Sequence, residues 1–149
     1  PVLEKRDIIE DTKNTVDYLQ TRVSQQVVFT FKAPEHPIYV DINPALHSWT
    51  IENLVKNAID AMKGKGSLNI IISELEDIVK ISITDSGKGI PKNQFTKVFE
   101  PGFTTKKRGW GLGLSLTKRI VQEYHKGKIK VAHSEIGKGT TMQISYKTA

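Results

Sequence analysis

The stretch VKISITDSGKGIP, Val79–Pro91, joins a strand pattern to a turn that begins with an acid. VKISIT alternates apolar and polar residues, which is typical of a half-buried strand. Two glycines, Gly87 and Gly89, follow Asp85 two positions apart. One glycine is usually enough for a turn, so the second indicates a backbone that stays bare to let a flat or anionic group approach it.

Helical and strand patterns alternate irregularly along the chain. Asn43 and Pro44 suit the cap and first turn of a helix. From the helical spacing of apolar residues we expect helices over 4–20, 44–62 and 112–124, with a short helix at 94–98. Strand patterns span 27–31, 38–42, 68–73, 77–84, 128–133 and 140–146. Because the strands come in neighbouring pairs, the sequence predicts an α+β fold: a two-layer α/β sandwich whose mixed, mainly antiparallel sheet carries helices on one face.

Length and composition limit the kinds of site and partner that this chain can have. The 149 residues suffice for a single domain over 1–149, and the absence of cysteine excludes disulfides and thiolate metal sites. The four histidines lack metal-ligand spacing and are predicted to be surface or packing residues. The chain has 22 Lys plus Arg against 16 Asp plus Glu, a net charge of +6. This balance fits an ordinary solvated surface, or attraction to nucleic acid, an anionic membrane or a polyphosphate.

The helical pattern at 52–62 carries a row of polar side chains. Asn53, Asn57 and Asp60 stand at i, i+4 and i+7 and therefore share one helix face. Oxygen ligands in such a row suit a hard cation such as Mg²⁺, which leaves its other positions to phosphates and water. The competing interpretation is a solvated polar face that binds nothing.

A second glycine-rich stretch, GWGLGL at Gly109–Leu114, opens the third long helical pattern. Bare N–H groups at a helix N-terminus bind phosphate. The preceding TTKKR, Thr104–Arg108, adds two hydroxyls and three cations. The dinucleotide fingerprint is excluded because Leu114 stands where its third glycine belongs, and no GxxxxGK[ST] phosphate loop is present.

Four segments, in this order, resemble those of a known family. IENLVKNAIDAM (51–62), DSGKGIP (85–91), VFEPGFTTK (98–106) and GWGLGL (109–114) resemble the N, G1, F and G2 boxes of the catalytic ATP-binding domain of sensor histidine kinases. That family belongs to the superfamily shared with gyrase B, Hsp90 and MutL. KGTTMQISY (138–146) is similar to its last strand. The match covers residues 44–146 and implies a Bergerat-type ATP-binding fold.

The resemblance implies a site for ATP and Mg²⁺. Asp85 would accept a hydrogen bond from the adenine amino group, while Gly87 and Gly89 let the chain turn past the base. Thr140 would assist near the adenine, and Asn57 would hold the Mg²⁺ that bridges the phosphates. The residues implied to contact the nucleotide are Asn53, Asn57, Asp60, Asp85, Gly87, Gly89, Ile90, Thr104, Thr105, Lys106, Gly109, Trp110, Gly111, Leu112, Gly113, Leu114 and Thr140.

Residues 86–109 correspond to the family's lid over ATP. Phe99 and Phe103 would anchor this lid, and Lys106 would reach the phosphates from it. Trp110 departs from the small residue usual at its place. Two interpretations stay open for Trp110: a plug in the hinge of the lid, or a stacking contact with the nucleotide or the dimerisation helix.

One position implies a kinase rather than an efficient ATPase. Hydrolysing members of the superfamily carry a glutamate base four residues before the Mg²⁺-binding asparagine, and here Asn53 stands at that place. Glu52 is adjacent but points about 100° away around the helix. The resemblance therefore implies phosphate transfer, with Asn53, Asn57 and Lys106 as catalytic residues.

The family's phosphoacceptor histidine has no counterpart here, since His47 lies in the helix leading to Asn53 and is followed by Ser48. The chain is expected to phosphorylate a histidine on a separate dimerisation domain, ahead of a response regulator. Pro1 and the helix at 1–20 favour a monomeric piece of a longer, homodimeric kinase whose catalytic part is cytoplasmic, on a membrane-anchored or soluble sensor. The alternative is a serine kinase of the anti-sigma-factor type. A nucleic-acid partner is not expected, because charge alone would not require these glycines and asparagines.

Overall fold

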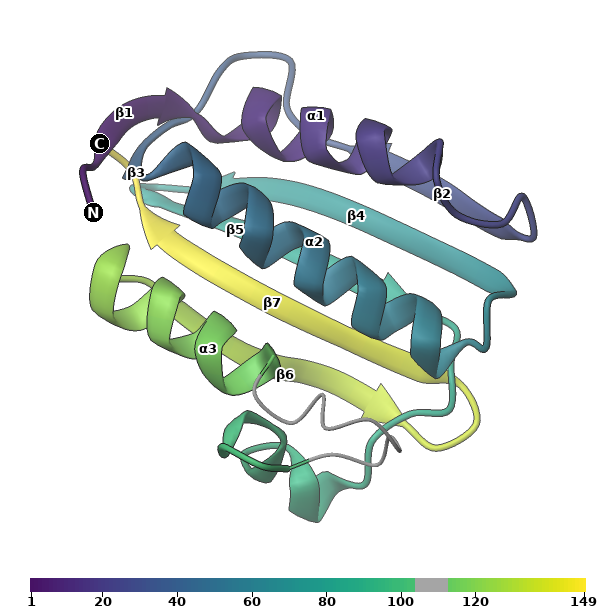
Figure 1. The fold of residues 1–149 in the computed structure, drawn as a ribbon. Coiled ribbons are helices and arrows are strands. Elements are labelled where there is room, and N and C mark those ends of the chain that lie inside the picture. The colour runs from purple at the N-terminus through teal and green to yellow at the C-terminus, as the bar shows by residue number, and fades with distance from the viewer. Residues whose placement is uncertain (104–112) are drawn as a thin grey trace.

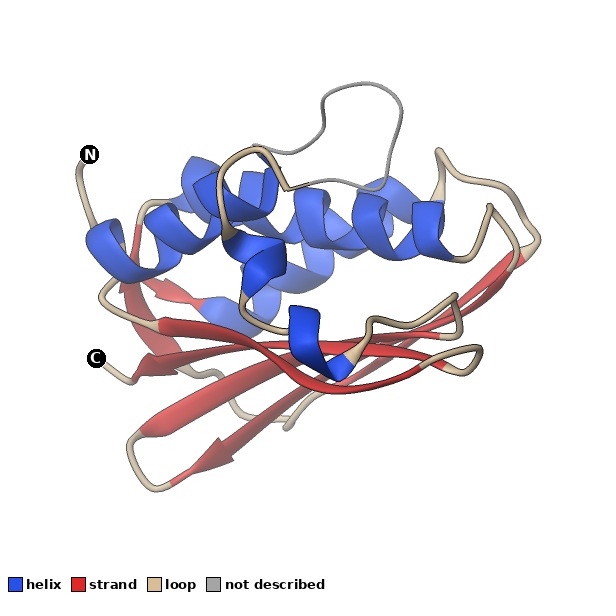
Figure 2. Ribbon diagram, turned by 90° about the horizontal axis from the view of Figure 1, so that it is seen from below, coloured by secondary structure: helices blue, strands red, loops and turns tan. Residues whose placement is uncertain are grey.

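The computed structural model describes residues 1–103 and 113–149, and in this part of the chain a five-stranded sheet carries helices (Figure 1). The sheet order is β2 (Val27–Lys32), β4 (Gly66–Leu75), β5 (Ile78–Asp85), β7 (Gly139–Lys147) and β6 (Lys128–Glu135). The helices described are α1 (Ile8–Gln20), α2 (Pro44–Ala61) and α3 (Gly113–Arg119), the last continued by a π-helical turn at Ile120–Tyr124. Figure 2 shows them on one side of the sheet, which confirms the predicted α+β sandwich.

The pairing of the strands explains why the sheet is mixed. β4–β5 and β6–β7 are antiparallel hairpins, as predicted, and β5 pairs with β7. Within the described residues, β2 does not pair with β3 (Tyr39–Ile42), its successor in the chain, but lies parallel to β4. Parallel neighbours need a long crossover, and α2 supplies it. β3 instead forms a separate antiparallel ribbon with β1 (Glu4–Asp7).

The predicted first helix begins four residues too early. Residues Glu4–Asp7 form β1, and the helix begins at Ile8 because Asp7 caps it: Asp7 Oδ1 accepts a hydrogen bond from the Ile9 N–H at 3.1 Å. The helical spacing of apolar residues begins only at Ile8. The pattern therefore identified the helix correctly, and the error lay in extending the helix beyond the pattern.

The core lies between the sheet and the helices. Val79, Ile81 and Ile83 of β5 are buried at alternate positions, and Asp85 is the next residue in that series. Leu54, Ala58 and Met62 of α2 are buried as well, whereas Ala61 is only half-buried. The alternation that builds the core therefore also points a carboxylate into the space between the two layers.

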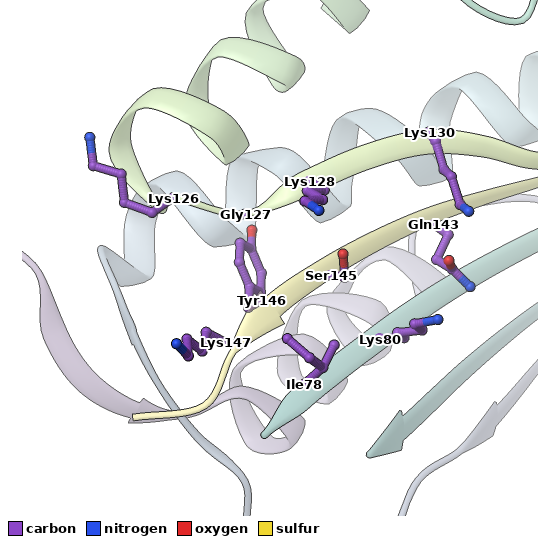
Figure 3. A pocket seen from close by; sticks show the side chains of 10 residues that line it. All are labelled: Ile78, Lys80, Lys126, Gly127, Lys128, Lys130, Gln143, Ser145, Tyr146 and Lys147. Atoms are coloured by element: carbon purple, nitrogen blue, oxygen red, sulfur yellow. The ribbon is translucent and has the colours of Figure 1, made fainter. Parts of the chain in front are cut away.

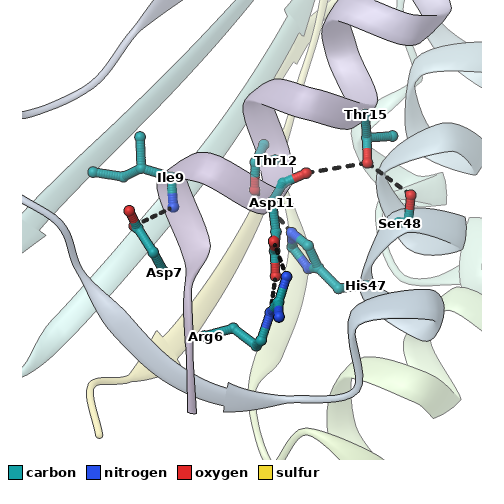
Figure 4. A network of polar contacts seen from close by, with 8 residues as sticks. All are labelled: Arg6, Asp7, Ile9, Asp11, Thr12, Thr15, His47 and Ser48. Carbon is teal, nitrogen blue, oxygen red and sulfur yellow. Dashed lines mark hydrogen bonds and ion pairs between the residues drawn. The ribbon is translucent and has the colours of Figure 1, made fainter. Parts of the chain in front are cut away.

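Polar contacts join α1 to α2 inside this core (Figure 4). Thr12 Oγ1 lies 2.8 Å from His47 Nε2, and Thr15 Oγ1 lies 2.7 Å from Ser48 Oγ. His47 is fully buried, and burial lowers its pKa to about 3. His47 is thus a packing residue, as predicted, and it fixes α1 on the helix that carries Asn53 and Asn57.

The chain after β5 runs through two short 3-10 turns, Lys92–Gln94 and Lys97–Phe99, where one short α-helix was predicted. Phe99 is buried and Phe103 packs against the core, as expected of anchors for this segment. No helix among residues 1–103 and 113–149 is both long and apolar enough to cross a bilayer.

Candidate functional site

Asp85 is a buried acid at the end of β5, directly opposite Thr140 of β7. Its Oδ1 accepts hydrogen bonds from two backbone N–H groups, that of Gly87 at 2.8 Å and that of Thr140 at 3.2 Å. Oδ2 takes no hydrogen bond from the residues that the structure describes. The side chain is therefore fixed through one oxygen, and the other is left as an acceptor.

The protonation of Asp85 reflects two opposed effects. Burial raises the pKa of the carboxyl, while the hydrogen bonds from the Gly87 and Thr140 N–H groups lower it. A carboxylate in this position has lost part of its hydration and has regained hydrogen bonds mainly at Oδ1. A ligand that donates a hydrogen bond to Oδ2 would stabilise the ionised form, and an exocyclic amine is such a donor.

Thr140 belongs to a small hydroxyl network that the sequence did not reveal. Its Oγ1 lies 2.7 Å from Ser134 Oγ, which accepts a hydrogen bond from the Ile90 N–H at 2.7 Å and lies 3.0 Å from the Gly139 carbonyl. Ser134 has one proton, so it donates either to Gly139 or to Thr140. If Ser134 donates to Thr140, the Thr140 hydroxyl proton is available to a ligand. The orientation of the Ser134 hydroxyl therefore decides whether Thr140 can donate a hydrogen bond to that ligand.

Ser134 was missed because its position depends on an irregularity in β6. The register of β6 against β7 shifts between Val131 and His133, which places Ser134 opposite Thr140. A bulge of this kind turns a side chain to the other face of the strand. No turn residue or motif in the sequence marks the bulge, so alternation alone could not assign Ser134 to the site.

The two glycines after Asp85 are required by protein neighbours. A Cβ at Gly87 would lie 2.6 Å from the carbonyl oxygen of Ala61, at the end of α2. Gly89 has φ +80°, and its Cβ would lie 2.3 Å from the carbonyl oxygen of Glu135. Only glycine tolerates such approaches. The sequence analysis predicted that a flat or anionic group would approach these glycines. The close neighbours in the structure are instead backbone atoms of the chain itself, at the end of α2 and in the β6–β7 turn.

Asn53, the first residue of the predicted polar face of α2, lies at the start of α3. Asn53 and Asn57 are half-buried and Asp60 is exposed. Asn53 Nδ2 donates to Thr117 Oγ1 at 2.8 Å, and Thr117 Oγ1 donates to the Gly113 carbonyl at 2.7 Å. This chain of hydrogen bonds fixes the amide of Asn53 and directs its oxygen to other partners. Thr117 is a second site residue that the sequence analysis did not identify.

Glu52, the acid next to Asn53, is engaged on the outside of α2. Its Oε1 lies 2.8 Å from Lys56 Nζ, one helical turn along. The ion pair and the 100° separation around the helix both turn this carboxylate away from Asn53. Among residues 1–103 and 113–149, no carboxylate therefore occupies the place of Asn53 beside α3.

The link between α2 and α3 can be tested by a double-mutant cycle. Asn53→Ala and Thr117→Val should each lower the free energy of unfolding by about 1 kcal/mol, because each removes one partner of a half-buried hydrogen bond. The double variant should cost about 1 kcal/mol less than the two losses added together. Urea denaturation gives the free energy of unfolding of the unaltered chain, the two single variants and the double variant. Glu52→Ala combined with Thr117→Val is the control and should be additive; additivity in the Asn53 cycle would disprove the link.

Several predicted site residues lie outside the described part of the chain: Thr104, Thr105, Lys106, Gly109, Trp110, Gly111 and Leu112. The structure gathers five of the others, Asp85, Gly87, Gly89, Ile90 and Thr140, where β5, β6 and β7 meet. Asn53 meets Gly113 where α2 contacts α3, and Leu114 packs against the core. Asn57 and Asp60 lie further along α2, half-buried and exposed respectively.

Comparisons with a family model and with individual known proteins point to the same family. Residues 45–149 match the family model described as "Histidine kinase-, DNA gyrase B-, and HSP90-like ATPase". The chain is 40% identical over 121 residues to the sensor histidine kinase ZraS of Escherichia coli, and 44% identical over 95 residues to sporulation kinase A of Bacillus subtilis. These matches cover 81% and 63% of the chain, but only 26% and 15% of the relatives.

A similar solved structure supports the same conclusion. The nucleotide-free catalytic domain of histidine kinase ThkA superimposes with a TM-score of 0.86 at 26% identity, and the match covers 97% of this chain and 95% of that one. The resemblance drawn from the four sequence segments, including the fold that it implied, is thereby confirmed.

Proposed function

Because the chain belongs to the family of histidine kinase-, DNA gyrase B- and HSP90-like ATPases, we propose that it binds Mg-ATP and presents the γ-phosphate to a histidine on a separate dimerisation domain. The observation that carries this proposal is Asp85, whose Oδ1 is held by two backbone N–H groups while Oδ2 faces no donor from the described residues. The chain spans about a quarter or less of ZraS and sporulation kinase A, so the activity of the whole protein belongs to this proposal.

Asp85 would select adenine by its charge. The carboxylate is acceptor-only when ionised, and the amino group of adenine is a donor, whereas guanine presents a carbonyl oxygen at the same place. The Thr140 hydroxyl, oriented by Ser134, would add a second polar contact near the base. Gly87 and Gly89 contribute by holding this edge of the site against α2 and the β6–β7 turn.

Asn57 would hold Mg²⁺ beside the phosphates. It is half-buried, it lies one turn beyond Asn53 on the same face of α2, and an amide oxygen suits a hard cation whose remaining ligands are phosphate oxygens and water. Mg²⁺ bound there would neutralise phosphate charge. Asn53, fixed by Thr117, would contact the phosphates, and Lys106 would add a positive charge from the lid at 86–109.

Transfer is favoured over hydrolysis because none of the described residues puts a base for water at the position of Asn53. Asn53 cannot accept a proton at neutral pH, and Glu52 is paired with Lys56 on the outside of the helix. The acceptor would be a histidine of the dimerisation domain in a homodimeric kinase with its catalytic part in the cytoplasm. A response regulator would act downstream, since a structure of ThkA in complex with the response regulator protein TrrA is among those similar to this chain. The names of the relatives favour histidine over serine as acceptor.

The proposal is tested by mixing this chain with the dimerisation domain of the same kinase, purified separately, and with Mg²⁺ and γ-labelled ATP. We expect an acid-labile, base-stable phosphate on that domain and none on the chain alone. A dimerisation domain whose acceptor histidine is replaced by glutamine is the matched control. Label on the isolated chain, acid-stable label on a serine, or rapid ATP hydrolysis without transfer would each contradict the proposal.

A further inference from the structure

The outer face of the sheet, opposite the helices, carries a cluster of lysines that nucleotide binding does not use. Figure 3 shows them around a hollow beside β5, β7 and β6, with Lys126 in the turn before β6 and its side chain directed away from the others. The hollow has a volume of about 470 Å³, and its lining includes five lysines and neither aspartate nor glutamate. We call these five the sheet lysines: Lys80, Lys126, Lys128, Lys130 and Lys147.

The sheet lysines account for nearly all of the excess positive charge of the chain. The whole sequence has 22 basic and 16 acidic residues, a net charge of +6. Without these five, 17 basic residues face 16 acidic ones, a net charge of +1. None of the five forms an ion pair with residues in the described ranges, whereas Lys13, Lys56 and Lys138 do. The excess charge is therefore concentrated on one face and is not neutralised there.

The strand register spreads these charges over a surface rather than along a line. Lys80 of β5 and Lys128 of β6 both stand opposite Ser145 of the intervening β7. Adjacent strands are about 4.8 Å apart, so these two lysines flank Ser145 about 10 Å from each other. Lys130 stands opposite Gln143 in the next outward-facing row. The result is a broad basic surface of flexible point charges.

Exposed aliphatic side chains continue the same face beyond the lysines. Leu75 is 74% exposed at the end of β4, and it pairs with Ile78, which lines the hollow. Ile71 of β4 and Val28 of β2 are 44% and 62% exposed, each next to buried residues in its strand. The outer face therefore combines a cationic half with a partly aliphatic half.

We propose that this face binds the surface of an anionic lipid bilayer. Lysines near such a surface each contribute a favourable electrostatic term, and neighbouring aliphatic side chains enter the interface. Single-stranded nucleic acid would need aromatic platforms, and the one aromatic side chain in the lining, Tyr146, is 1% exposed. Duplex DNA would not require the aliphatic half. Asp85 and Asn53 lie on the opposite side of the sheet, so a chain bound in this way keeps its nucleotide site clear of the bilayer.

The test is co-sedimentation of the chain with phosphatidylcholine vesicles with and without phosphatidylglycerol. Binding is expected only with phosphatidylglycerol and should fall steeply between about 0.1 M and 0.5 M salt. The triple variant Lys80→Gln, Lys128→Gln, Lys130→Gln should bind roughly 100-fold more weakly, at about fivefold per lysine. The control Lys13→Gln, Lys56→Gln, Lys63→Gln removes the same charge from the helix side and should bind like the unaltered chain.

Two further measurements keep the proposal falsifiable. Leu75→Ser changes no charge and should weaken vesicle binding several-fold, which provides a test even if the triple variant does not fold. Duplex DNA and polyglutamate serve as competing anions. Equal binding to both kinds of vesicle, an equal loss in both triple variants, or binding to DNA or polyglutamate but not to vesicles would each overturn the proposal.

Discussion

Replacing Asp85 by asparagine is expected to weaken ATP binding roughly 100-fold. The substitution keeps the oxygen that accepts from the Gly87 and Thr140 N–H groups but can put an amide NH₂ in place of Oδ2. A donor would then face the adenine amino group, and a charge-assisted hydrogen bond worth about 1.5–3 kcal/mol would be lost. Isothermal titration with a non-hydrolysable ATP analogue in the presence of Mg²⁺ measures the change.

The same substitution should make the nucleotide-free chain more stable at neutral pH. Burial raises the pKa of Asp85 in the folded state, so the folded chain holds this proton more tightly than the unfolded chain. A group of this kind contributes stability at low pH that is lost as the pH rises through its folded pKa. Asparagine carries no charge that burial must desolvate. The variant should therefore keep, at neutral pH, the stability that the unaltered chain loses when Asp85 ionises. Urea denaturation at neutral pH should therefore show a higher free energy of unfolding.

These opposite signs separate a role in binding from a role in folding. Asp77→Asn, at the exposed β4–β5 turn, is the matched control and should alter neither quantity. ATP affinity of the unaltered chain should also decrease as the pH falls through the raised pKa of Asp85, and the asparagine variant should lack this dependence. If the asparagine variant bound ATP as tightly as the unaltered chain, Asp85 would not be the adenine acceptor.

Acid should destabilise the fold through His47, by about 2 kcal/mol between neutral pH and pH 5. Burial lowers the pKa of His47 from 6.5 to about 3, and His125 acts in the same direction on it. In the unfolded chain His47 is therefore protonated as the pH falls through about 6.5, whereas in the folded chain it stays neutral until about pH 3. Stability is complete above the unfolded pKa and is lost, at about 1.4 kcal/mol per pH unit, as the pH falls below it.

The measurement is urea denaturation at a series of pH values between 7.5 and 5 in the unaltered chain and in His47→Gln. The variant should be less stable at neutral pH, because His47 packs between Thr12 and Tyr146, but its stability should fall less steeply with acid. Burial also lowers the pKa of His125, so part of the slope should persist. His133→Gln, on the surface, is the control; a slope unchanged in His47→Gln would refute the assignment.

Much of the fold was predictable because it depends on local patterns. Asn43 caps α2 through a hydrogen bond from the Leu46 N–H at 3.0 Å, as its place before Pro44 predicted. The alternation predicted for VKISIT is observed in β5, and in the structure it continues to Asp85 on the inner face. Hairpins between strands close in sequence followed from short connections. Each of these features requires information from only a few neighbouring residues.

The sequence by itself determined which residues carry the candidate chemistry: an acid after a period-two strand, amides at helical spacing on α2, and glycines where the backbone must stay bare. Only the tertiary structure decided which residues support them. Ser134 reaches Thr140 through a bulge, Thr117 reaches Asn53 from another helix, and the sheet lysines come together from the middle and the C-terminal part of the chain. The first depends on the register between two strands, and the others join residues far apart in sequence through packing, neither of which a local pattern records.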